Sequence, residues 1–381
     1  MKSNYKPIGE LVERIDERNK DGSITTLIGV SIDKRFIPSV ANVIGTDLTN
    51  YKVIRKYDFA VSLMQVSRDE KIPVACQKDY EAAIMSPAYP IFRVKNEHVI
   101  LPEYLEMWFM RSEFDREASF VAVGGVRGSM PWEEFAKLKL PVPDIETQKK
   151  IVSSYRTITD RIALKKQIND NLEATLNAVF VKIYEETDDE ASVLLSDLCS
   201  LASSKRVFAD DYVADGVPFY RGKEITQKRN GEPISDPLFI GRNHFSSLKA
   251  NYGIPVSGDI LITAVGTIGN SYLVQDEEFY FKDGNIIWLK DFVEPSLSYY
   301  VYDYMQTPIF KRQLEGICIG STQTALTIVA LSKLKVKKPR AAELTPYCEK
   351  SRALRSAIQT NNSEIERLTQ VAQSMLASLS R

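Results

Sequence analysis

An internal repeat places the strongest constraint on how this chain can fold. Residues 126–143, VRGSMPWEEFAKLKLPVP, align without a gap with residues 322–339, TQTALTIVALSKLKVKKP, at an offset of 196 positions. Further upstream the offset drifts, and the segment at 104–114 resembles the one at 300–310 with a slip of one position. A duplication on this scale in a chain of 381 residues predicts two related globular units.

Each repeat is followed by a long segment with heptad spacing. Two interleaved rows of residues, seven positions apart within a row, alternate by four and three, and the pattern recurs 196 positions later. This spacing predicts two helices of roughly 35 residues, about 50 Å long, that pair as a coiled coil. The residues expected to pair the helices are Ile151, Tyr155, Ile158, Ile162, Leu172, Leu176, Leu354, Ile358, Ile365, Leu368 and Met375.

One polar position interrupts the seam in both repeats. Lys165 occupies it in the first repeat and Asn361 in the second. A buried polar layer in a coiled coil can fix the register at some cost in stability. A lysine at such a position can instead extend its ammonium group into solvent. The sequence leaves both interpretations open.

The repeat suggests four segments. We expect a globular unit at 1–147, a long helix at 148–187, a second globular unit at 188–341 and a second long helix at 342–381. Runs typical of strands, such as NIIWLK, predominate in the globular parts, and short amphipathic helices are expected at 102–118 and 295–314. The fold class is therefore α/β (α+β), with two similar domains alternating with two long helices.

Composition excludes several classes of protein. The net charge of −1 gives no global attraction to nucleic acid, and the chain has no run of 18 apolar residues and no apolar leader. We therefore expect a cytoplasmic protein without a membrane partner. The four cysteines are scattered, with no CxxC, and the two histidines lie far apart. This pattern argues against disulfides, a metal site and most triad chemistry.

The layout resembles the specificity subunit of Type I restriction–modification systems. The resemblance covers the whole chain and rests on LKLPVPDIETQKKIV with its helix, LKVKKP with the second helix, GVPFYRGKEI, SGDILITAVGTIGN and IGSTQTAL. It implies that each globular unit is a target-recognition domain for one half of a split site in double-stranded DNA. It also implies that the two helices pack antiparallel as a spacer.

The same resemblance implies the partners. Two methyltransferase (modification) subunits would dock on this chain for adenine methylation, and two motor/nuclease (restriction) subunits would join for cleavage. The chain itself would perform no chemistry and need no cofactor. Two departures stand out. The second proline segment reads KKPRAAELTPY where the first reads PVPDIETQKKI, which suggests that the second helix begins later. The first unit also has KYDFAVSLMQVSRD where the second has the glycine-rich SGDILITAVGTIGN.

Direct reading of bases needs paired donors and acceptors, for which Arg, Asn and Gln side chains are the usual choice. Polar and basic residues gather beside glycines in several loops, although each such loop could simply be solvated. In the second unit the candidates for DNA contact are Arg221, Lys223, Gln227, Lys228, Arg229, Arg242, Asn243, His244, Thr267, Ser321, Thr322 and Gln323. In the first unit they are Lys34, Arg35, Gln65, Ser67, Arg68, Arg127 and Ser129.

Two other functional classes, a nuclease and a protein-binding scaffold, have some support in the sequence. Asp58 followed by Asp69, Glu70 and Lys71 loosely matches the spacing of metal-dependent nucleases, but such spacing is common by chance in a chain with 50 acidic residues. We interpret it as a strand start and a charged turn, and we expect no catalytic residues. A non-catalytic scaffold, with two protein-binding modules on a coiled coil, remains the alternative.

Overall fold

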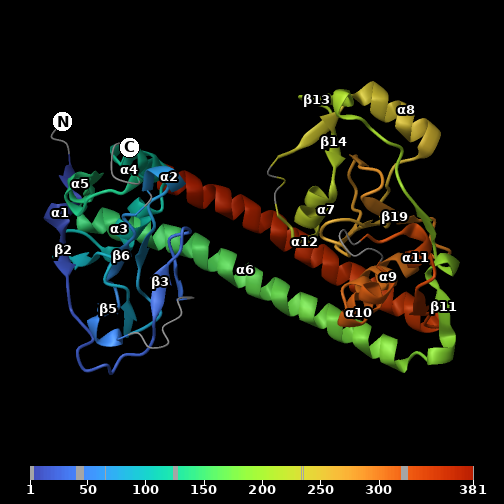
Figure 1. Ribbon diagram of the computed structural model, residues 1–381, viewed down its shortest axis with the longest axis horizontal. Helices are drawn as coiled ribbons and strands as arrows, with labels where there is room; N and C mark the ends of the chain where they lie inside the picture. The colour runs from blue at the N-terminus through green and yellow to red at the C-terminus, as the bar shows by residue number, and fades with distance from the viewer. Residues whose placement is uncertain are drawn as a thin grey trace. The chain divides into compact units, whose positions relative to one another are not determined.

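The computed structural model describes residues 4–39, 47–64, 66–122, 128–232, 234, 236–318 and 325–380. The chain forms two compact units, one from residues 1–164 with 364–381 and the other from residues 165–363. Both long helices, α6 (Ile145–Glu186) and α12 (Ala341–Ser378), contribute to both units (Figure 1). The four-segment division made from the sequence assigns the helices separately and remains a prediction.

A four-stranded antiparallel sheet forms the centre of the first unit. Its strands lie in the order β2 (Val12–Ile15), β9 (Ile91–Val94), β6 (Phe59–Val61) and β7 (Val74–Cys76). Every residue of β6 and β7 is buried, which explains why these segments are continuous apolar runs rather than alternating ones. Phe59 stacks on Phe92 of the neighbouring strand with ring centroids 5.3 Å apart.

The second unit repeats this sheet. Its strands lie in the order β12 (Ser200–Ala202), β19 (Ile286–Lys290), β16 (Ile260–Thr263) and β17 (Ser271–Leu273), again with antiparallel neighbours. The two orders correspond strand for strand. The prediction of a mixed α/β class with an internal repeat is therefore confirmed, and the duplication extends to the sheet topology.

A two-stranded ribbon joins each unit to the following long helix. In the first unit, β1 (Tyr5–Pro7) pairs with β10 (Lys139–Pro141), and in the second, β11 (Ser192–Leu194) pairs with β20 (Lys335–Lys337). The short helices α1 (Ile8–Leu11) and η4 (Leu195–Asp197) follow the first strand of each ribbon. Their first amides donate to Leu138 O and Leu334 O, in both cases at 2.8 Å.

Three helices cover the core of each unit before its long helix begins. They are α3 (Pro102–Phe109), α4 (Ser112–Val121) and α5 (Trp132–Lys137) in the first unit, and α9 (Leu297–Met305), α10 (Pro308–Ile317) and α11 (Ile328–Ser332) in the second. Thr307 caps α10 by accepting a hydrogen bond from Phe310 N at 3.2 Å, and proline occupies its first turn, where no amide donor is needed.

The units differ in the segments inserted around the common sheet. The first unit adds the hairpin β3 (Ile28–Val30)–β4 (Phe36–Pro38), η1 (Leu48–Asn50), the pair β5 (Lys52–Arg55)–β8 (Ala82–Met85) and α2 (Val66–Asp69). The second adds a sheet in the order β13 (Tyr212–Val213), β15 (Leu238–Ile240), β14 (Val217–Tyr220) and β18 (Tyr280–Phe281), with α7 (Gly222–Arg229), α8 (Arg242–Tyr252), η3 (Asp189–Ala191) and η5 (Ala209–Asp211).

The long helices run antiparallel within each unit, because residues later in α6 contact residues earlier in α12. In the first unit Arg161 forms an ion pair with Glu364. In the second unit Lys165 Nζ donates to Asn361 Oδ1 at 2.9 Å, and Phe180 lies 6.4 Å from Tyr347 between ring centroids.

The interruption of the seam is thus a polar layer, because Lys165 and Asn361, equivalent by the repeat, bond to each other rather than extending separately into solvent. Asn169 joins this layer: its side-chain amide bonds to Asn361 and Asn362, each at 2.8 Å.

The expectation that the second long helix begins later than the first was wrong. Helix α6 begins at Ile145 and α12 at Ala341, which are equivalent positions at the offset of 196. Pro346 lies inside α12 and removes one amide donor from its second turn. Thr345 Oγ1 donates to Ala341 O at 3.1 Å and supplies a side-chain bond in the same turn.

A buried glutamine anchors the start of α6 to the first unit. Gln148 is fully buried, and its Oε1 accepts from Leu101 N at 2.9 Å. Its Nε2 donates to Val99 O at 2.9 Å and to Pro143 O at 2.8 Å. The side chain therefore satisfies backbone groups of the 99–101 segment and of Pro143, just before α6. In the second repeat the equivalent position is occupied by apolar Leu344.

We predict that Gln148→Leu destabilises the first unit. Leucine conserves the volume but leaves one buried amide and two carbonyl groups without their partner, at a cost of roughly 3 kcal/mol or more. In urea unfolding, the midpoint of the first transition should occur at a lower urea concentration in the variant than in the unmodified chain. Gln167→Leu, at an exposed position of the same helix, is the matched control and should leave the curve unchanged. Coincident curves for all three proteins would contradict the anchoring role.

Candidate nucleic-acid interface

In the first unit, the connection from β6 to β7 meets the segment that enters α5. Met130 N donates to Leu63 O at 2.9 Å and holds the two segments together. Gly128 has φ +73°, and a Cβ atom there would lie only 2.5 Å from Ser67 Oγ. Glycine is favoured here chiefly because φ is positive, since Ser67 could rotate its hydroxyl away from a Cβ atom. The contact brings three of the residues predicted from the sequence to one edge: Ser67, Arg68 and Ser129.

The second unit builds the same edge from equivalent elements. The connection from β16 to β17 meets the segment that enters α11, and Leu326 N donates to Ala264 O at 2.9 Å. Val265 forms an antiparallel bridge with Ala325 beside this bond. Thr267 lies exposed in the connection. The two repeats thus place a polar loop at the same end of the same sheet, although their sequences there differ.

Helix α7 lies along this edge in the second unit. Thr226 Oγ1 is 3.2 Å from Thr267 Oγ1 and accepts from Asn270 Nδ2 at 3.0 Å. Arg229 Nη1 donates to Asn270 Oδ1 at 3.0 Å. These bonds bring the predicted cluster at 221–229 next to the β16–β17 connection, as neighbouring parts of one surface. Asn270 and Thr226 were missed by the sequence analysis, because only the folded turn brings them together.

Arg221, the first residue of the cluster, stabilises the start of α7. Arg221 Nη2 and Nε contact the Glu224 carboxylate at 2.5 and 3.1 Å, and the Arg221 amide donates to it at 2.8 Å. The Glu224 side chain is fully buried. Burial alone would raise the pKa of Glu224, but the guanidinium and amide of Arg221 outweigh it and lower that pKa. The carboxylate therefore stays ionised at the start of α7.

The last two residues of α7 also make internal contacts. Lys228 Nζ lies 2.8 Å from the Glu277 carboxylate and 5.5 Å from the ring centroid of Tyr272. Arg229 Nη2 donates to Gln306 Oε1 at 3.0 Å. Both side chains are partly buried. Their charges bind elements of the unit to one another, so we assign them to supporting the surface rather than to reading DNA directly. Gln227, also partly buried, lies beside them.

Among the predicted residues that the structure describes in this unit, the exposed ones are Thr267 and three residues at the starts of two helices. Lys223 is in the first turn of α7, and Arg242 and Asn243 begin α8; all three are exposed. His244 is partly buried, and its Nδ1 is 3.9 Å from the Asp211 carboxylate. Backbone amides at helix starts and exposed basic side chains are both suited to phosphate oxygens. Solvent and a ligand can thus reach these residues and Thr267.

Lys34 in the first unit has a different role from the one predicted. Its side chain is 8% exposed, its Nζ lies 2.8 Å from the Asp115 carboxylate, and it donates to Phe109 O. Burial lowers the pKa of Lys34, and Asp115 opposes that shift. This lysine therefore connects the β3–β4 turn to α4 inside the unit, and we withdraw it from the DNA-contact set. The adjacent Arg35 is exposed.

Five predicted contacts lie outside the described residues: Gln65, Arg127, Ser321, Thr322 and Gln323.

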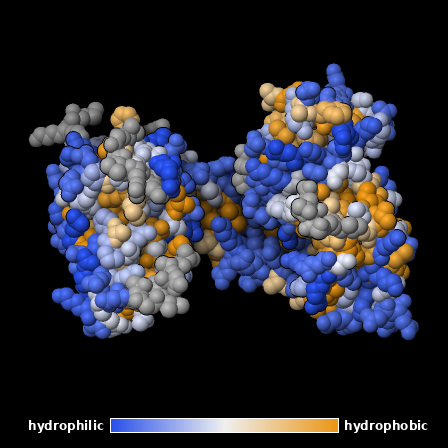
Figure 2. All heavy atoms as spheres, in the orientation of Figure 1, coloured by the Kyte–Doolittle hydropathy of each residue, from blue (hydrophilic) through white to orange (hydrophobic). Residues whose placement is uncertain are grey.

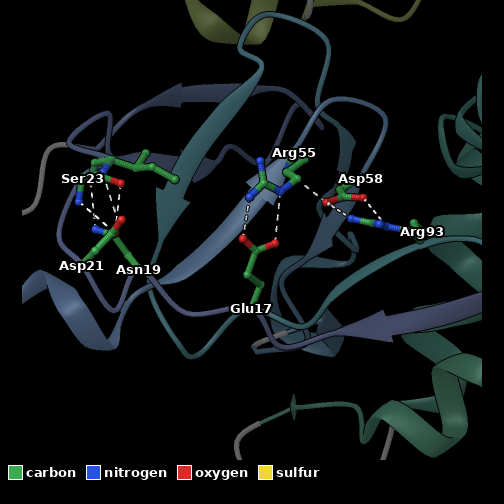
Figure 3. Close-up of polar contacts among 8 residues, drawn as sticks. Glu17, Asn19, Asp21, Ser23, Arg55, Asp58 and Arg93 are labelled. Carbon is green, nitrogen blue, oxygen red and sulfur yellow. Dashed lines mark hydrogen bonds and ion pairs between the residues drawn. The ribbon is translucent and has the colours of Figure 1, made fainter.

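Asp58, the residue that suggested nuclease chemistry, lies within an ionic network (Figure 3). The Arg93 guanidinium donates to its two carboxylate oxygens at 2.9 and 3.0 Å, and Arg55 N donates to it at 2.9 Å. Arg55 in turn forms a double contact with Glu17. The Asp58 side chain is 3% exposed, so this carboxylate is used to join β5, β6 and β9. Lys71 Nζ lies 3.9 Å from Asp33. Across the described ranges, no three His, Cys, Asp or Glu side chains gather as metal ligands.

The residues predicted to pair the helices lie on the less exposed stripe of α6 and α12. Leu176 is buried, and the other ten are partly buried. Ile151 and Tyr155 pack against the core of the first unit, which also contains Leu379, the residue just after α12. On the face shown in Figure 2, hydrophilic side chains predominate along the exposed parts of the long helices. None of the helices within the described ranges is long and apolar enough to cross a bilayer.

The fold and the candidate interface together define a class of protein that has two related modules on a pair of long helices. Two related modules repeat one sheet topology, each presents a polar edge of loops, and an antiparallel helix pair contributes to both. The S subunit of a Type-I restriction-modification system from M. genitalium has this fold, with a TM-score of 0.62 over 99% of this chain and 96% of that one, at 13% identity.

Sequence comparison identifies the family. The model of the Type I restriction modification DNA specificity domain matches residues 72–174 and 188–366, which is more than half of the chain. This chain therefore belongs to that family, as the resemblance predicted. It is 27% identical over 229 residues to a Haemophilus influenzae protein that carries the name of a type I restriction enzyme specificity subunit, covering 58% of this chain and 56% of the relative. It is also 26% identical over 139 residues to the HindI specificity subunit of that organism, covering 36% of this chain and 30% of the relative.

We predict that the ion pair at the start of α7 makes the second unit sensitive to acid. Because the pKa of Glu224 is lower in the folded state, its contribution to stability is present above the unfolded value of about 4.3 and is lost as pH falls through the folded value. Glu224→Gln should therefore lower the urea midpoint at about pH 7, and the difference should shrink at about pH 3. Glu232→Gln, at an exposed position, should show neither effect. A difference that does not depend on pH would contradict the assignment.

Proposed function

We propose that this chain is the DNA sequence-specificity subunit of a Type I restriction–modification complex and performs no catalysis itself. Each unit reads one half of a bipartite site in double-stranded DNA, and the paired helices set the gap between the halves. The observation that carries the proposal is the polar edge built twice, at the same end of the same sheet, in a chain of this family. A duplicated reader is suited to a target that has two parts.

The chemistry of the exposed residues supports a division of roles between the polar edge and the start of α8. Arg and Asn side chains match the hydrogen-bonding edges of guanine and adenine, and lysines and helix starts match phosphates. In the second unit we propose Arg242 and Asn243 for base contact and Lys223 and Thr267 for the backbone. In the first unit we propose Arg35 and Arg68 for contact, with Ser67 and Ser129 beside them. The two sets differ, as two different half-sites would require.

The partners follow from the family and are also proposals. Two methyltransferase subunits would dock on the helices and their ribbons, and the complex would methylate adenine. Motor/nuclease subunits would join when cleavage is required. The matched regions cover about half of the first Haemophilus relative and about a third of the second, so the activity of the whole complex is inferred here rather than transferred.

The alternative is a scaffold whose two modules bind proteins. The helix pair would serve such a protein equally well, but the polar side chains at both edges favour nucleic acid. An apolar protein interface and a DNA interface respond differently to salt, because only DNA binding releases condensed counterions.

We predict that exchange of one unit changes one half of a methylated motif. The chain is co-expressed with its methyltransferase, and methylated positions are mapped at base resolution across the host DNA. A chimera that replaces residues 1–147 with the same unit of another specificity subunit is mapped in parallel. The unmodified chain should give a split motif, and the chimera should change one half while the other half and the gap stay the same.

The outcomes are distinguishable. A motif that changes in both halves would reject the assignment of one unit to one half-site. A complex that assembles and contains an active methyltransferase, yet methylates no defined sequence, would support the scaffold.

We also predict a steep salt dependence for the assembled complex on its cognate duplex. With several phosphate contacts, affinity should fall by about 1,000-fold or more between roughly 50 and 200 mM salt. Lys223→Ala should reduce the slope of log affinity against log salt by about one. Lys182→Ala, at an exposed position on α6, is the control and should leave the slope unchanged. Affinity that is insensitive to salt would argue for the scaffold.

A further inference from the structure

One buried carboxylate connects α9 of the second unit to three successive turns of α12. Asp303 is 6% exposed, near the end of α9. Its carboxylate accepts hydrogen bonds from Tyr347 Oη and from Ser351 Oγ, the latter at 3.0 Å, and pairs with the Arg355 guanidinium. Tyr347, Ser351 and Arg355 are four residues apart, so they lie on one face of α12. We call this group the Asp303 clamp.

The surroundings of the clamp restrict how α12 can rotate against α9. The Arg355 guanidinium carbon lies 4.5 Å from the centroid of the Tyr302 ring, and its side chain is 24% exposed. Burial lowers the pKa of Arg355. A buried ion pair that is also hydrogen-bonded has a defined geometry, because its donors and acceptors must stay aligned. The clamp therefore fixes the rotation of α12 about its axis relative to α9.

A polar connection continues from the clamp to the candidate interface. Gln306 follows α9 by one residue, and its Oε1 accepts from Arg229 Nη2 at 3.0 Å while its Nε2 donates to Ser271 Oγ at 2.8 Å. Arg229 also donates to Asn270 Oδ1 at 3.0 Å in the β16–β17 connection. The spacer helix is thus linked, through Asp303 and Gln306, to α7 and to the loop that carries Thr267.

The first repeat lacks this clamp. At the offset of 196, the positions of Tyr347, Ser351 and Arg355 are occupied by Ile151, Tyr155 and Thr159. Asp303 corresponds to Met107, or to Trp108 when the offset slips by one. Ile151 and Tyr155 pack against the apolar core of the first unit. In the first unit the buried polar contact is made instead by Gln148 of α6, which bonds to Leu101, Val99 and Pro143, so the two units differ in their buried polar contacts with the long helices.

We propose that Asp303 and Arg355 are positioning residues that set the angle at which the second unit reads its half-site, and so restrict the permitted gap on that side. The inference rests on the proposed function. One base pair of B-DNA shifts a half-site by about 3.4 Å along the helix axis and by roughly 35° around it. A unit held by the clamp cannot follow that rotation without breaking the hydrogen bonds to Asp303.

The test replaces the clamp without leaving a charge buried. Removing one partner of a buried ion pair strongly destabilises a protein, but replacing both with apolar residues is often neutral. The test variant is therefore Asp303→Leu with Arg355→Met, in the full chain co-expressed with its methyltransferase. The matched control removes another ion pair of the same unit, Arg206→Met with Asp283→Leu, whose partners lie 2.8 Å apart and away from α12.

The readout is base-resolution methylation, sorted by gap length. We expect the clamp variant to keep both half-site sequences and to raise methylation at sites whose gap differs by one base pair about tenfold, equivalent to ~1.4 kcal/mol. The control should keep the gap of the unmodified chain. If the clamp variant assembles and methylates only that gap, the proposal is overturned. Absence of split-motif methylation by the unmodified chain would instead reject the proposed function.

A milder variant covers a failure to fold. Tyr347→Phe with Ser351→Ala removes two hydrogen bonds to Asp303 and leaves the ion pair in place. It should relax the gap in the same direction, by a smaller factor. A gap as strict as that of the unmodified chain in this variant, when the clamp variant does not accumulate, would also overturn the proposal.

Discussion

The seam between α6 and α12 is the constraint on which the rest of the structure depends. Each unit contains a part of both helices, so neither is complete without residues from the other half of the chain. Leu379, near the end of the chain, is buried in the core of the first unit, and Phe180 and Ile183 of α6 are buried in the core of the second. Folding must therefore bring together segments about 200 residues apart. The polar layer of Lys165 and Asn361 favours one register, since a shifted helix would place these groups against apolar neighbours.

Duplication has preserved the framework and varied what is attached to it. The four-stranded sheets, the ribbons and the helices before each long helix correspond between the units, whereas the inserted strands and helices do not. The anchors differ as well, because buried Gln148 holds the start of α6 where Leu344 holds the start of α12. A common framework keeps both polar edges at the same end of the sheet. The inserts are then free to differ, as the proposal of two half-site readers requires.

The sequence was sufficient for features that depend on local pattern or on the repeat. Heptad spacing predicted both helices, and the offset of 196 marked Lys165 and Asn361 as equivalent before their contact was known. It was insufficient where a long-range partner decides the role of a charge. Lys34 belongs to a basic turn in the sequence, yet Asp115, about 80 residues away, draws its ammonium group inside. The departure at the second proline segment also misled, because tertiary packing holds α12 from Ala341 despite Pro346.

The same distinction between local and long-range roles applies to the basic residues of α7. Arg221, Lys228 and Arg229 form a cluster in the sequence that is typical of nucleic-acid binding, but their side chains bond to Glu224, Glu277 and Gln306. A guanidinium already bonded to a carboxylate or amide inside the protein has fewer donors left for a base edge. Under the proposed function, contact with DNA would be made by exposed residues such as Lys223, whose helix is held in place by these internal bonds. Arg229 illustrates the consequence, because its bonds to Gln306 and Asn270 fix the end of α7 relative to α9 and to the β16–β17 connection.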